Sequence, residues 1–296
     1  MAYSTDLDVF EEHRSVLMGV AYRMLGAFAD AEDVVQDTWL RWSTADREQV
    51  RDARGYLVRI ATRLSLDRLR QAQARREAYV GSWLPEPVAT DVRGDELSDG
   101  SERALLAESV TLAMLVVMES LSPLERAVFV LREAFGFPYA EIGATLDRSE
   151  EAVRQLAGRA RRHVTERKPR YDVDVAAQRT ITERFLEAAA GGDLEGLMAV
   201  LAPDVDVVSD AGGKAKAPRR VITGADKTAR FLLGGTRDLG DLVEPRFVLR
   251  EINGRPGLVL LSKGEPDSVM GLEVRAGRIA RVYVMRNPEK LGAVTP

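Results

Sequence analysis

The sequence contains no cysteine and only two histidines, His13 and His163. Without thiols the chain can form neither a disulfide framework nor a thiolate zinc site. Two histidines this far apart in the sequence offer no basis for a histidine metal site. We therefore expect neither a metal ion nor a cofactor.

Long apolar runs are also missing, since none approaches the roughly 20 residues that a transmembrane helix needs. The first residues carry Asp6 and Asp8 and lack the basic-then-apolar layout of a secretory signal. These features predict a soluble, cytoplasmic protein with no membrane partner.

Excess charge of one sign is absent as well, because the net charge is only -4 at pH 7. The distribution is uneven: residues 28–48 are acidic, whereas two predicted helices at 53–77 and 149–166 are rich in arginine. One such helix could be a solvated face. Two of them favour contacts with DNA phosphates. The arginines are Arg54, Arg59, Arg63, Arg68, Arg70, Arg75 and Arg76 in the first helix, and Arg154, Arg159, Arg161 and Arg162 in the second.

The 296 residues correspond to roughly two or three domains at ordinary domain sizes. Apolar residues at helical spacing predict three helices within 8–76, and Asp30 is expected to cap the second. Residues 78–102 are rich in proline, glycine and acids and read as a linker. We assign domains to 1–77, 103–168 and 175–296, with the linker at 78–102.

Residues 103–168 read as helices again, beginning with one at 105–121. Ser122 to Glu125 forms a capping box with proline at the first helical position. Two further helices, at 139–146 and 149–166, are joined by a short turn and form a predicted helix-turn-helix, and Ser149 is expected to cap the second. Its shared core should contain Ala140, Ile142, Gly143, Leu146, Val153 and Leu156. Its outward face should present Glu150, Glu151, Arg154, Gln155 and Arg159.

Residues 175–296 change character. Helices are predicted at 175–190, at 194–201 up to Pro203, and at 224–233. Alternating β-branched segments predict an antiparallel set of strands, which makes this an α+β domain. The strands are expected at 205–209, 246–252, 257–262, 268–274 and 278–286.

Three segments of the helical part carry a resemblance to a known family. Asp30 to Trp39 resembles the segment of sigma region 2 that docks on the β′ clamp helices of RNA polymerase. Arg54 to Arg70 resembles the helix that opens and reads the minus-ten element. Leu121 to Arg162 resembles sigma region 4, which reads the minus-35 element. The chain is thus similar to sigma factors of the extracytoplasmic-function type, which implies two all-α domains, a region 2 bundle and a region 4 helix-turn-helix.

This resemblance implies core RNA polymerase, through its β′ clamp helices and β flap, and promoter DNA as partners. Core packing is the alternative role for Trp39, and many family members have asparagine where this chain has Arg63. The implied polymerase contacts are Asp30, Glu32, Asp33, Gln36, Asp37 and Trp39. The implied minus-ten contacts are Arg54, Tyr56, Arg59, Arg63, Arg68 and Arg70. The implied minus-35 contacts are Ser149, Glu150, Arg154, Gln155, Arg159, Arg161 and Arg162.

The last domain resembles the SnoaL-like or NTF2-like fold, a curved sheet wrapped by helices around a cone-shaped cavity. Segments 83–87, 210–214 and 287–291 resemble motifs of the sigma subgroup with a fused SnoaL-like extension, which usually has glycine where this chain has Ala211. A glycine-rich turn is the plainer explanation of 210–214. The implied regulatory contacts are Trp83, Leu84, Pro85, Asp210, Gly212, Gly213, Lys214, Asn287, Pro288, Lys290 and Leu291.

Two functions follow from this pattern. We favour a sigma factor that directs RNA polymerase to promoters, is regulated in cis by its last domain and is not an enzyme. A small-molecule ligand in the cone is a further partner that the fold allows. The alternative is a SnoaL-type enzyme or ligand sensor tethered to DNA, with Asp206, Asp210, Arg230 and Glu273 in the cone. The acidic helix near residues 30–42 favours the sigma factor, because a tethered enzyme has no need of it.

Overall fold

The computed structural model describes residues 6–46, 50–76, 79–91, 110–167, 175–237 and 242–294. The chain forms two compact units. The helical unit contains 1–77, 108–110 and 114–168, and the α+β unit contains 78–107, 111–113 and 169–296. The described part of the predicted linker, residues 79–91, therefore belongs to the α+β unit.

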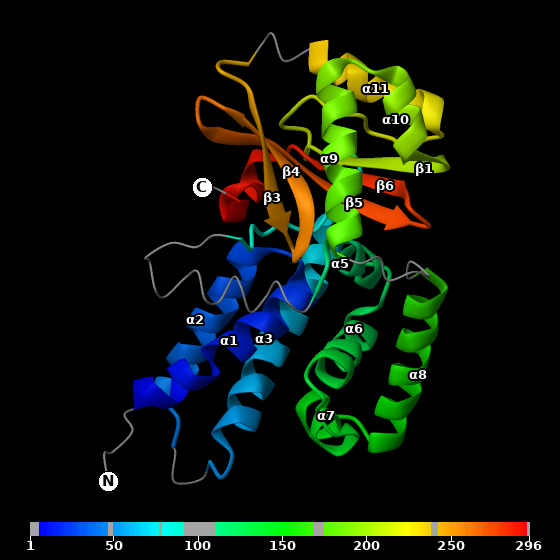
Figure 1. Ribbon diagram of the computed structural model, residues 1–296. Coiled ribbons are helices and arrows are strands. Elements are labelled where there is room, and N and C mark those ends of the chain that lie inside the picture. Colours follow the sequence, from blue (N-terminus) through cyan, green and yellow to red (C-terminus); the bar gives the residue numbers. More distant parts are fainter. Residues whose placement is uncertain are drawn as a thin grey trace. The chain divides into compact units, whose positions relative to one another are not determined.

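The first part of the helical unit is a three-helix bundle of α1 (Asp6–Leu25), α2 (Phe28–Ser43) and α3 (Ala53–Arg76) (Figure 1). The prediction that Asp30 caps α2 is wrong. The cap position is Ala27, which makes no side-chain capping bond, because the chain turns at Gly26 with φ 69° and enters the helix earlier. Asp30 lies in the first turn instead, where its charge favours the positive end of the helix dipole.

The second part of the helical unit contains residues 114–118 of α5 (Leu112–Met118), α6 (Pro123–Phe129), the π-helix η2 (Val130–Ala134), α7 (Tyr139–Leu146) and α8 (Glu150–Arg167). The capping box is confirmed: the backbone N–H of Glu125 donates to Ser122 Oγ, and the backbone N–H of Ser122 donates to the Glu125 carboxylate. The first helix was predicted at 105–121, and its positions 105–109 lie outside the described residues. The described helix is shorter than predicted at both ends.

The helix-turn-helix is formed by α7 and α8. Ile142, Leu146, Val153 and Leu156 are buried as predicted, whereas Ala140 is exposed, which corrects its assignment to the core. A Cβ atom at Gly143 would lie 2.7 Å from the Arg148 carbonyl oxygen, so the turn between the helices requires glycine there. The backbone N–H of Ala152 donates to Ser149 Oγ, which confirms the predicted cap of the second helix.

In its described residues the α+β unit contains the α-helices α9 (Val175–Gly191), α10 (Leu194–Val200) and α11 (Ala225–Arg237), and a six-stranded sheet. The strand order is β2-β1-β6-β5-β4-β3. The strands are β1 (Leu201–Asp210), β2 (Ile222–Thr223), β3 (Arg246–Ile252), β4 (Arg255–Ser262), β5 (Glu265–Arg275) and β6 (Arg278–Met285).

The sheet is mixed rather than antiparallel, because β1 pairs with β6 in parallel. These two strands are far apart in the sequence, so no tight hairpin turn fixes their direction. Pro203 does not end α10 but lies inside β1, and the short β2 was not predicted. The other elements match the predicted ones within a few residues.

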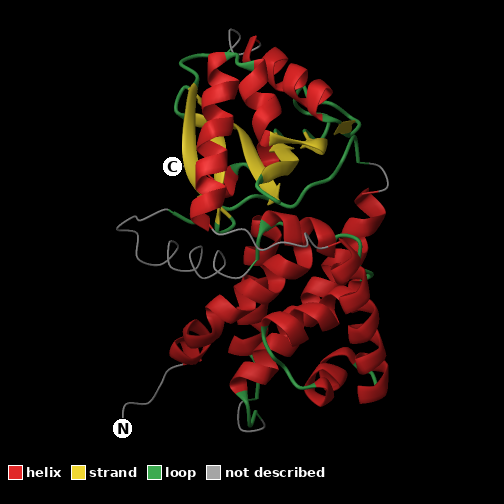
Figure 2. Cartoon of the chain, turned by 45° about the vertical axis from the view of Figure 1, so that its right-hand side comes forward, coloured by secondary structure: helices red, strands yellow, loops and turns green. Residues whose placement is uncertain are grey.

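One face of the sheet is covered by α9, α10 and α11 (Figure 2). A buried apolar cluster that includes Phe185, Leu197, Val205 and Val282 lies between these helices and the sheet. Alternate residues of a strand point to opposite faces. Asp206, Asp210 and Glu273 are therefore on the other face, and the exposed Arg230 pairs with Asp226 on α11. The interpretation that these four side chains line the cone is wrong.

Candidate functional sites

The acidic residues of α2 contact an arginine of α3. One Arg68 nitrogen donates to Asp33 at 3.0 Å and to the Asp30 carbonyl at 3.2 Å, and the other donates to Asp37 at 2.8 Å. The side chains of Asp33 and Asp37 remain 63% and 43% exposed, so both are accessible to a partner. The structure thus joins three predicted polymerase contacts to a predicted minus-ten contact. Glu32 and Gln36 are exposed beside them.

The two tryptophans of α2 differ in environment. Trp42 is buried and its indole Nε1–H donates to the Asp6 carbonyl at 3.0 Å, so it is a core residue. Trp39 is half-buried, with its ring 5.1 Å from that of Phe10 in an edge-on arrangement. Leu40 beside it is 58% exposed. An exposed leucine next to a half-buried tryptophan is a typical interface surface, and sequence reasoning overlooked Leu40.

The predicted minus-ten arginines lie along α3. Arg59 lies over the ring of Tyr56 with 5.7 Å to its centroid, and Arg70 pairs with Asp67 one turn earlier. Two others contact the helix-turn-helix part of the same unit. Arg54 lies over the Phe137 ring at 4.9 Å, and Arg63 Nε donates to the Thr145 carbonyl at 3.0 Å.

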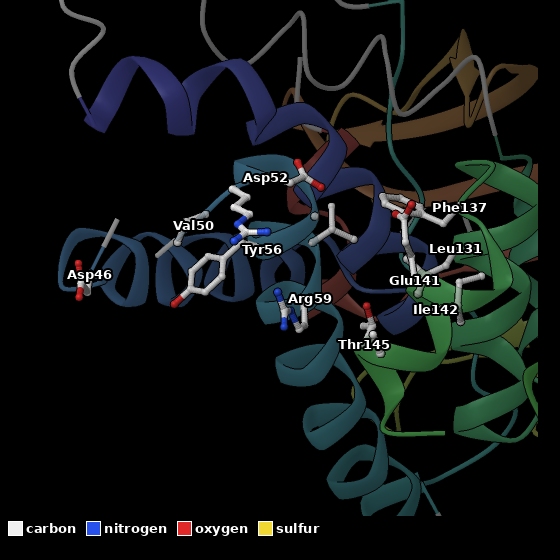
Figure 3. A pocket seen from close by; sticks show the side chains of 14 residues that line it. Asp46, Val50, Asp52, Tyr56, Arg59, Leu131, Phe137, Glu141, Ile142 and Thr145 are labelled. Carbon is white, nitrogen blue, oxygen red and sulfur yellow. The ribbon is translucent and has the colours of Figure 1, made fainter. Parts of the chain in front are cut away.

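A pocket of about 600 Å³ lies beside these contacts (Figure 3). One wall is formed by Asp46 and residues 50–59, and the other by residues 131–145. Its lining includes the buried Val58, Leu131 and Ile142. The first wall adds acids and arginines, and the second adds Glu141. The two parts of the helical unit are therefore not close-packed at this position.

The second helix of the helix-turn-helix exposes the side chains predicted to read DNA. Gln155 is exposed, and Arg154 pairs with Glu150 at 2.5 Å within the same helix. Arg161 is bound to Glu133 and to the hydroxyl of Tyr139, which orients its guanidinium. The remaining predicted minus-35 contacts, Ser149, Arg159 and Arg162, are also exposed.

Arg159 is held by an acid of α6. Its Nε–H donates to Glu125 at 3.1 Å. Partial burial alone would raise the pKa of Glu125, but hydrogen bonds from Ser122 and Arg159 lower it below the usual value. The carboxylate therefore stays charged and fixes this arginine in the middle of the recognition helix.

A buried arginine that was not predicted joins α6 to α1. Arg126 is 1% exposed, pairs with Glu119, and its Nε–H donates to the carbonyl of Arg23 at 3.1 Å. Arg23 is buried too, and burial lowers its pKa to about 10. Charged side chains buried in this way fix the packing of the elements that carry them. Only Arg23 had a signal in the sequence, as the one charged residue in the apolar stretch 16–29.

Asp210 is the centre of a polar network in the α+β unit. It lies at the end of β1 and is fully buried. Its carboxylate accepts hydrogen bonds from the Tyr79 hydroxyl at 2.6 Å, the Leu84 backbone N–H at 2.8 Å and Lys290 Nζ at 2.7 Å. Two of these donors, Tyr79 and Leu84, come from the linker, so the linker stabilises a buried carboxylate by hydrogen bonds. We call Asp210, Gly212, Asn287 and Lys290 the linker-docking site.

Lys290 binds the same linker segment by other contacts. Its Nζ donates to the Leu84 carbonyl at 2.7 Å and lies 4.0 Å from the ring centroid of Trp83. Asn287 donates to the Tyr79 hydroxyl at 2.9 Å. Burial, together with the neighbouring Asp210, raises the pKa of Tyr79, so the phenol stays protonated as a donor.

The glycine-rich loop after β1 needs its glycines. Gly212 has φ 57°, and a Cβ there would lie 2.6 Å from Asn287 Nδ2 and 3.0 Å from the Tyr79 hydroxyl. Gly213 has φ 73° and packs against Val80. Ala211 is not among the residues with positive φ, so its methyl group causes no strain. The predicted contact Lys214 pairs with Glu289 at the surface rather than with the linker.

The linker also extends along the edge strand β3. The backbone N–H groups of Val88, Ala89 and Thr90 donate to Asn253 Oδ1, the Ala293 carbonyl and the Glu251 carbonyl. Leu84 is 1% exposed, which confirms that this apolar residue has a burial site. The predicted contacts Pro85 and Leu291 are buried as well, and Pro288 begins a short 3-10 helix (Pro288–Lys290). Sequence reasoning missed Tyr79, Asn253 and the edge pairing.

These features define the class of the protein: a DNA-reading transcription factor with a second unit that binds its interdomain linker. Among the described residues no group of three or more acids, histidines or cysteines could hold a metal ion. No helix in the described ranges has the length and apolarity to span a membrane.

Comparisons with known proteins identify the family. Residues 9–75 match the model of Sigma-70 region 2, and residues 111–164 match that of Sigma-70 region 4. The chain is 38% identical over 293 residues to the ECF RNA polymerase sigma factor SigJ of Mycobacterium tuberculosis, covering 96% of this chain and 93% of SigJ. It is 34% identical over 284 residues to the probable ECF sigma factor SigI of the same species, covering 94% and 92%.

The crystal structure of M. tuberculosis SigJ superimposes with a TM-score of 0.76 at 35% identity, covering 97% of this chain and 98% of SigJ. The chain belongs to the extracytoplasmic-function RNA polymerase sigma factors. It therefore directs RNA polymerase to promoters and is not an enzyme.

Proposed function

We propose that the α+β unit regulates this sigma factor in cis by holding the linker between regions 2 and 4. The observation that carries the proposal is the pairing of buried Asp210 with Lys290 around Leu84 of the linker. Both backbone groups of Leu84 are used, one by each charged side chain. If the linker left, each of these two buried charges would lose a hydrogen-bond partner that takes the place of water.

Docking of the linker limits the positions that regions 2 and 4 can take. Promoter elements lie a set distance apart, so the effective concentration of one region at its element depends on the chain that joins it to the other. Removing residues 175–296 should impair transcription, because the linker then also loses its contacts at the edge of β3, which brace it. Trimming only the tail after Arg286 removes Asn287 and Lys290, and it should release inhibition.

We propose the contacts of the helical unit with polymerase and promoter DNA from the exposure and charge of its side chains. The acids of α2, with Trp39, fit the β′ clamp helices of core polymerase, because an exposed acidic rim beside an aromatic anchor suits a basic partner. The α3 arginines fit the minus-ten strands. The exposed face of α8 fits the minus-35 major groove, and region 4 fits the β flap. Promoter binding places the protein in the cytoplasm.

A small-molecule ligand in the cone is less well supported than the linker as the regulatory ligand. In the described residues, the helix-covered face of the sheet carries a cluster of buried apolar side chains, including Phe185 and Leu197. The candidate polar side chains lie on the opposite face, where Asp206 and Glu273 contact Arg281. No site within the described ranges favours the alternative of a tethered enzyme.

Run-off transcription with core polymerase tests the proposal. The full chain, a chain ending at Arg286 and a chain ending before Val175 are compared on one promoter, with core binding measured in parallel. We expect higher activity than the full chain for the first truncation and lower activity for the second. Equal activity of all three chains at equal core binding would show that the α+β unit is a passenger.

A further inference from the structure

Tyr139, the first residue of α7, contacts two arginines of the recognition helix α8 and one arginine of the π-helix η2. Its hydroxyl accepts a hydrogen bond from Nη2 of Arg161 at 2.8 Å. The guanidinium carbon of Arg154 lies 5.7 Å from the ring centroid, and that of Arg132 lies 4.6 Å from it. All four residues belong to the helical unit. The contacts proposed for the minus-35 element include Arg154 and Arg161 but neither Tyr139 nor Arg132.

The ring of Tyr139 is held in place by the chain that precedes α7. Tyr139 is half-buried, and Arg132 Nη1 donates to the Phe137 carbonyl at 3.0 Å. The same guanidinium that binds this loop also lies over the ring, a favourable position for a cation near an aromatic face. The tyrosine therefore presents its ring and its hydroxyl to α8 from a fixed position.

Both arginines of α8 keep donors for DNA while they are held. Arg161 binds Glu133 through Nε at 2.9 Å and Nη2 at 2.8 Å, and it binds Tyr139 through Nη2. Its Nη1, which carries two of the five N–H groups of a guanidinium, has no partner among the described residues. Arg154 binds Glu150 through Nη2 alone, and its side chain is 64% exposed. DNA can therefore bind both arginines without displacing their present partners.

We propose that Tyr139 is a positioning residue for promoter recognition: its ring orients Arg154 toward a base edge, and its hydroxyl orients Arg161 toward a phosphate. The proposal rests on the proposed docking of α8 in the minus-35 major groove. An arginine that moves freely in the unbound protein loses rotamer freedom when it binds, and this loss lowers the affinity. Arginines that Tyr139 already orders avoid part of this loss. One side chain thus supports both a sequence-specific and a sequence-independent contact.

Two substitutions separate the ring from the hydroxyl. Tyr139→Phe keeps the ring beside Arg154 and removes the group that Arg161 binds, whereas Tyr139→Leu removes both. Holoenzyme is assembled from core polymerase and each full chain, and its affinity is measured for a promoter duplex and for duplexes with single changes in the minus-35 element. Thermal unfolding checks that each variant folds. The control, Tyr283→Phe, removes a buried hydroxyl that donates to Glu273 in the α+β unit, and it should match the parent on every duplex.

Tyr139→Phe should weaken binding to all duplexes alike by about fivefold, the effect of one hydrogen bond or one side chain that must be ordered on binding. Tyr139→Leu should in addition lower the discrimination at one base pair by about threefold, the effect of an exposed cation–π contact. Arg154→Ala identifies this base pair, because discrimination should be lost there.

Double variants distinguish positioning from a general structural role, because a positioning residue acts only through its partner. Tyr139→Phe should cause no further loss of affinity in Arg161→Ala, and Tyr139→Leu no further loss of discrimination in Arg154→Ala. A general loss of stability would instead lower the affinity equally in every background.

Two results would overturn the positioning role while leaving the docking of α8 intact. One is a loss in the double variants that equals the sum of the single losses. The other is parent-like discrimination in Tyr139→Leu at the base pair where Arg154→Ala loses it. Failure of the docking itself has a different signature: Arg154→Ala would then leave discrimination unchanged at every position, and both the docking of α8 and the role of Tyr139 would be rejected.

Discussion

Replacing Lys290 by methionine should detach the linker from the α+β unit while leaving the fold of that unit intact. Methionine fills a similar volume but removes the charge that faces Asp210. The Lys290 side chain is 11% exposed and that of Asp210 is fully buried, so solvent screens the pair little. The carboxylate would keep the donors Tyr79, Leu84 and the Gly212 N–H.

Breaking a buried ion pair by removing one partner costs about 3–5 kcal/mol. Since Asp210 retains three donors, we take the lower end, about 3 kcal/mol, which corresponds to roughly a hundredfold change in the docking equilibrium. The double variant Asp210→Asn with Lys290→Met should cost less than the two single variants together, because no unpaired charge remains.

Amide hydrogen exchange at Leu84, Val88 and Ala89 measures the docking equilibrium of the linker directly, because each N–H donates to a group outside the linker. Exchange should accelerate by about two orders of magnitude in Lys290→Met. The control is Lys214→Met, whose exposed pair with Glu289 should contribute about 0–1 kcal/mol. Equal protection in Lys290→Met and the parent would refute the assignment of Lys290 to linker docking.

Three further outcomes are expected. The folded pKa of Tyr79 is raised, so its contribution to docking should be complete below about pH 10 and be lost as the pH rises through the folded pKa; Trp83 fluorescence should follow this loss in the parent and not in Tyr79→Phe. Asp33→Arg should weaken the binding of core polymerase in a pull-down titration. It should not unfold the chain, since the exposed pair of Asp33 with Arg68 adds only about 0–1 kcal/mol to the folding stability. Unchanged core affinity would contradict the docking assignment. Gln155→Ala should reduce minus-35 discrimination by about 1–3 kcal/mol, whereas Arg162→Ala should weaken all sequences alike and flatten the salt dependence; an equal loss on all DNA for Gln155→Ala would mean that α8 is docked differently.

Local signals made most elements predictable from the sequence. The capping box at Ser122 and the cap at Ser149 were found because a side chain bonds to a backbone group three residues away. The cap of α2 was not, because Gly26 turns the chain by its backbone alone and leaves no polar cap to recognise. The strands were identified by alternation, which does not distinguish the parallel pairing of β1 with β6.

The linker-docking site could be predicted only in part. The burial of Leu84 follows from an apolar residue in a polar, proline-rich segment. The pairing of Asp210 with Lys290 depends on residues 80 positions apart, and no spacing rule predicts it. Lys214 and Lys290 both belong to segments that resemble motifs of the sigma subgroup. Lys214 is exposed and Lys290 is buried, a difference that only the tertiary structure determines.

Run-off transcription by core polymerase with the Lys290→Met chain tests the central claim most directly, with hydrogen exchange of the linker measured on the same samples. If docking restrains the sigma factor, Lys290→Met should transcribe faster than the parent and show rapid exchange at Leu84, and Lys214→Met should match the parent in both. Rapid exchange at Leu84 with unchanged transcription would contradict control through the linker.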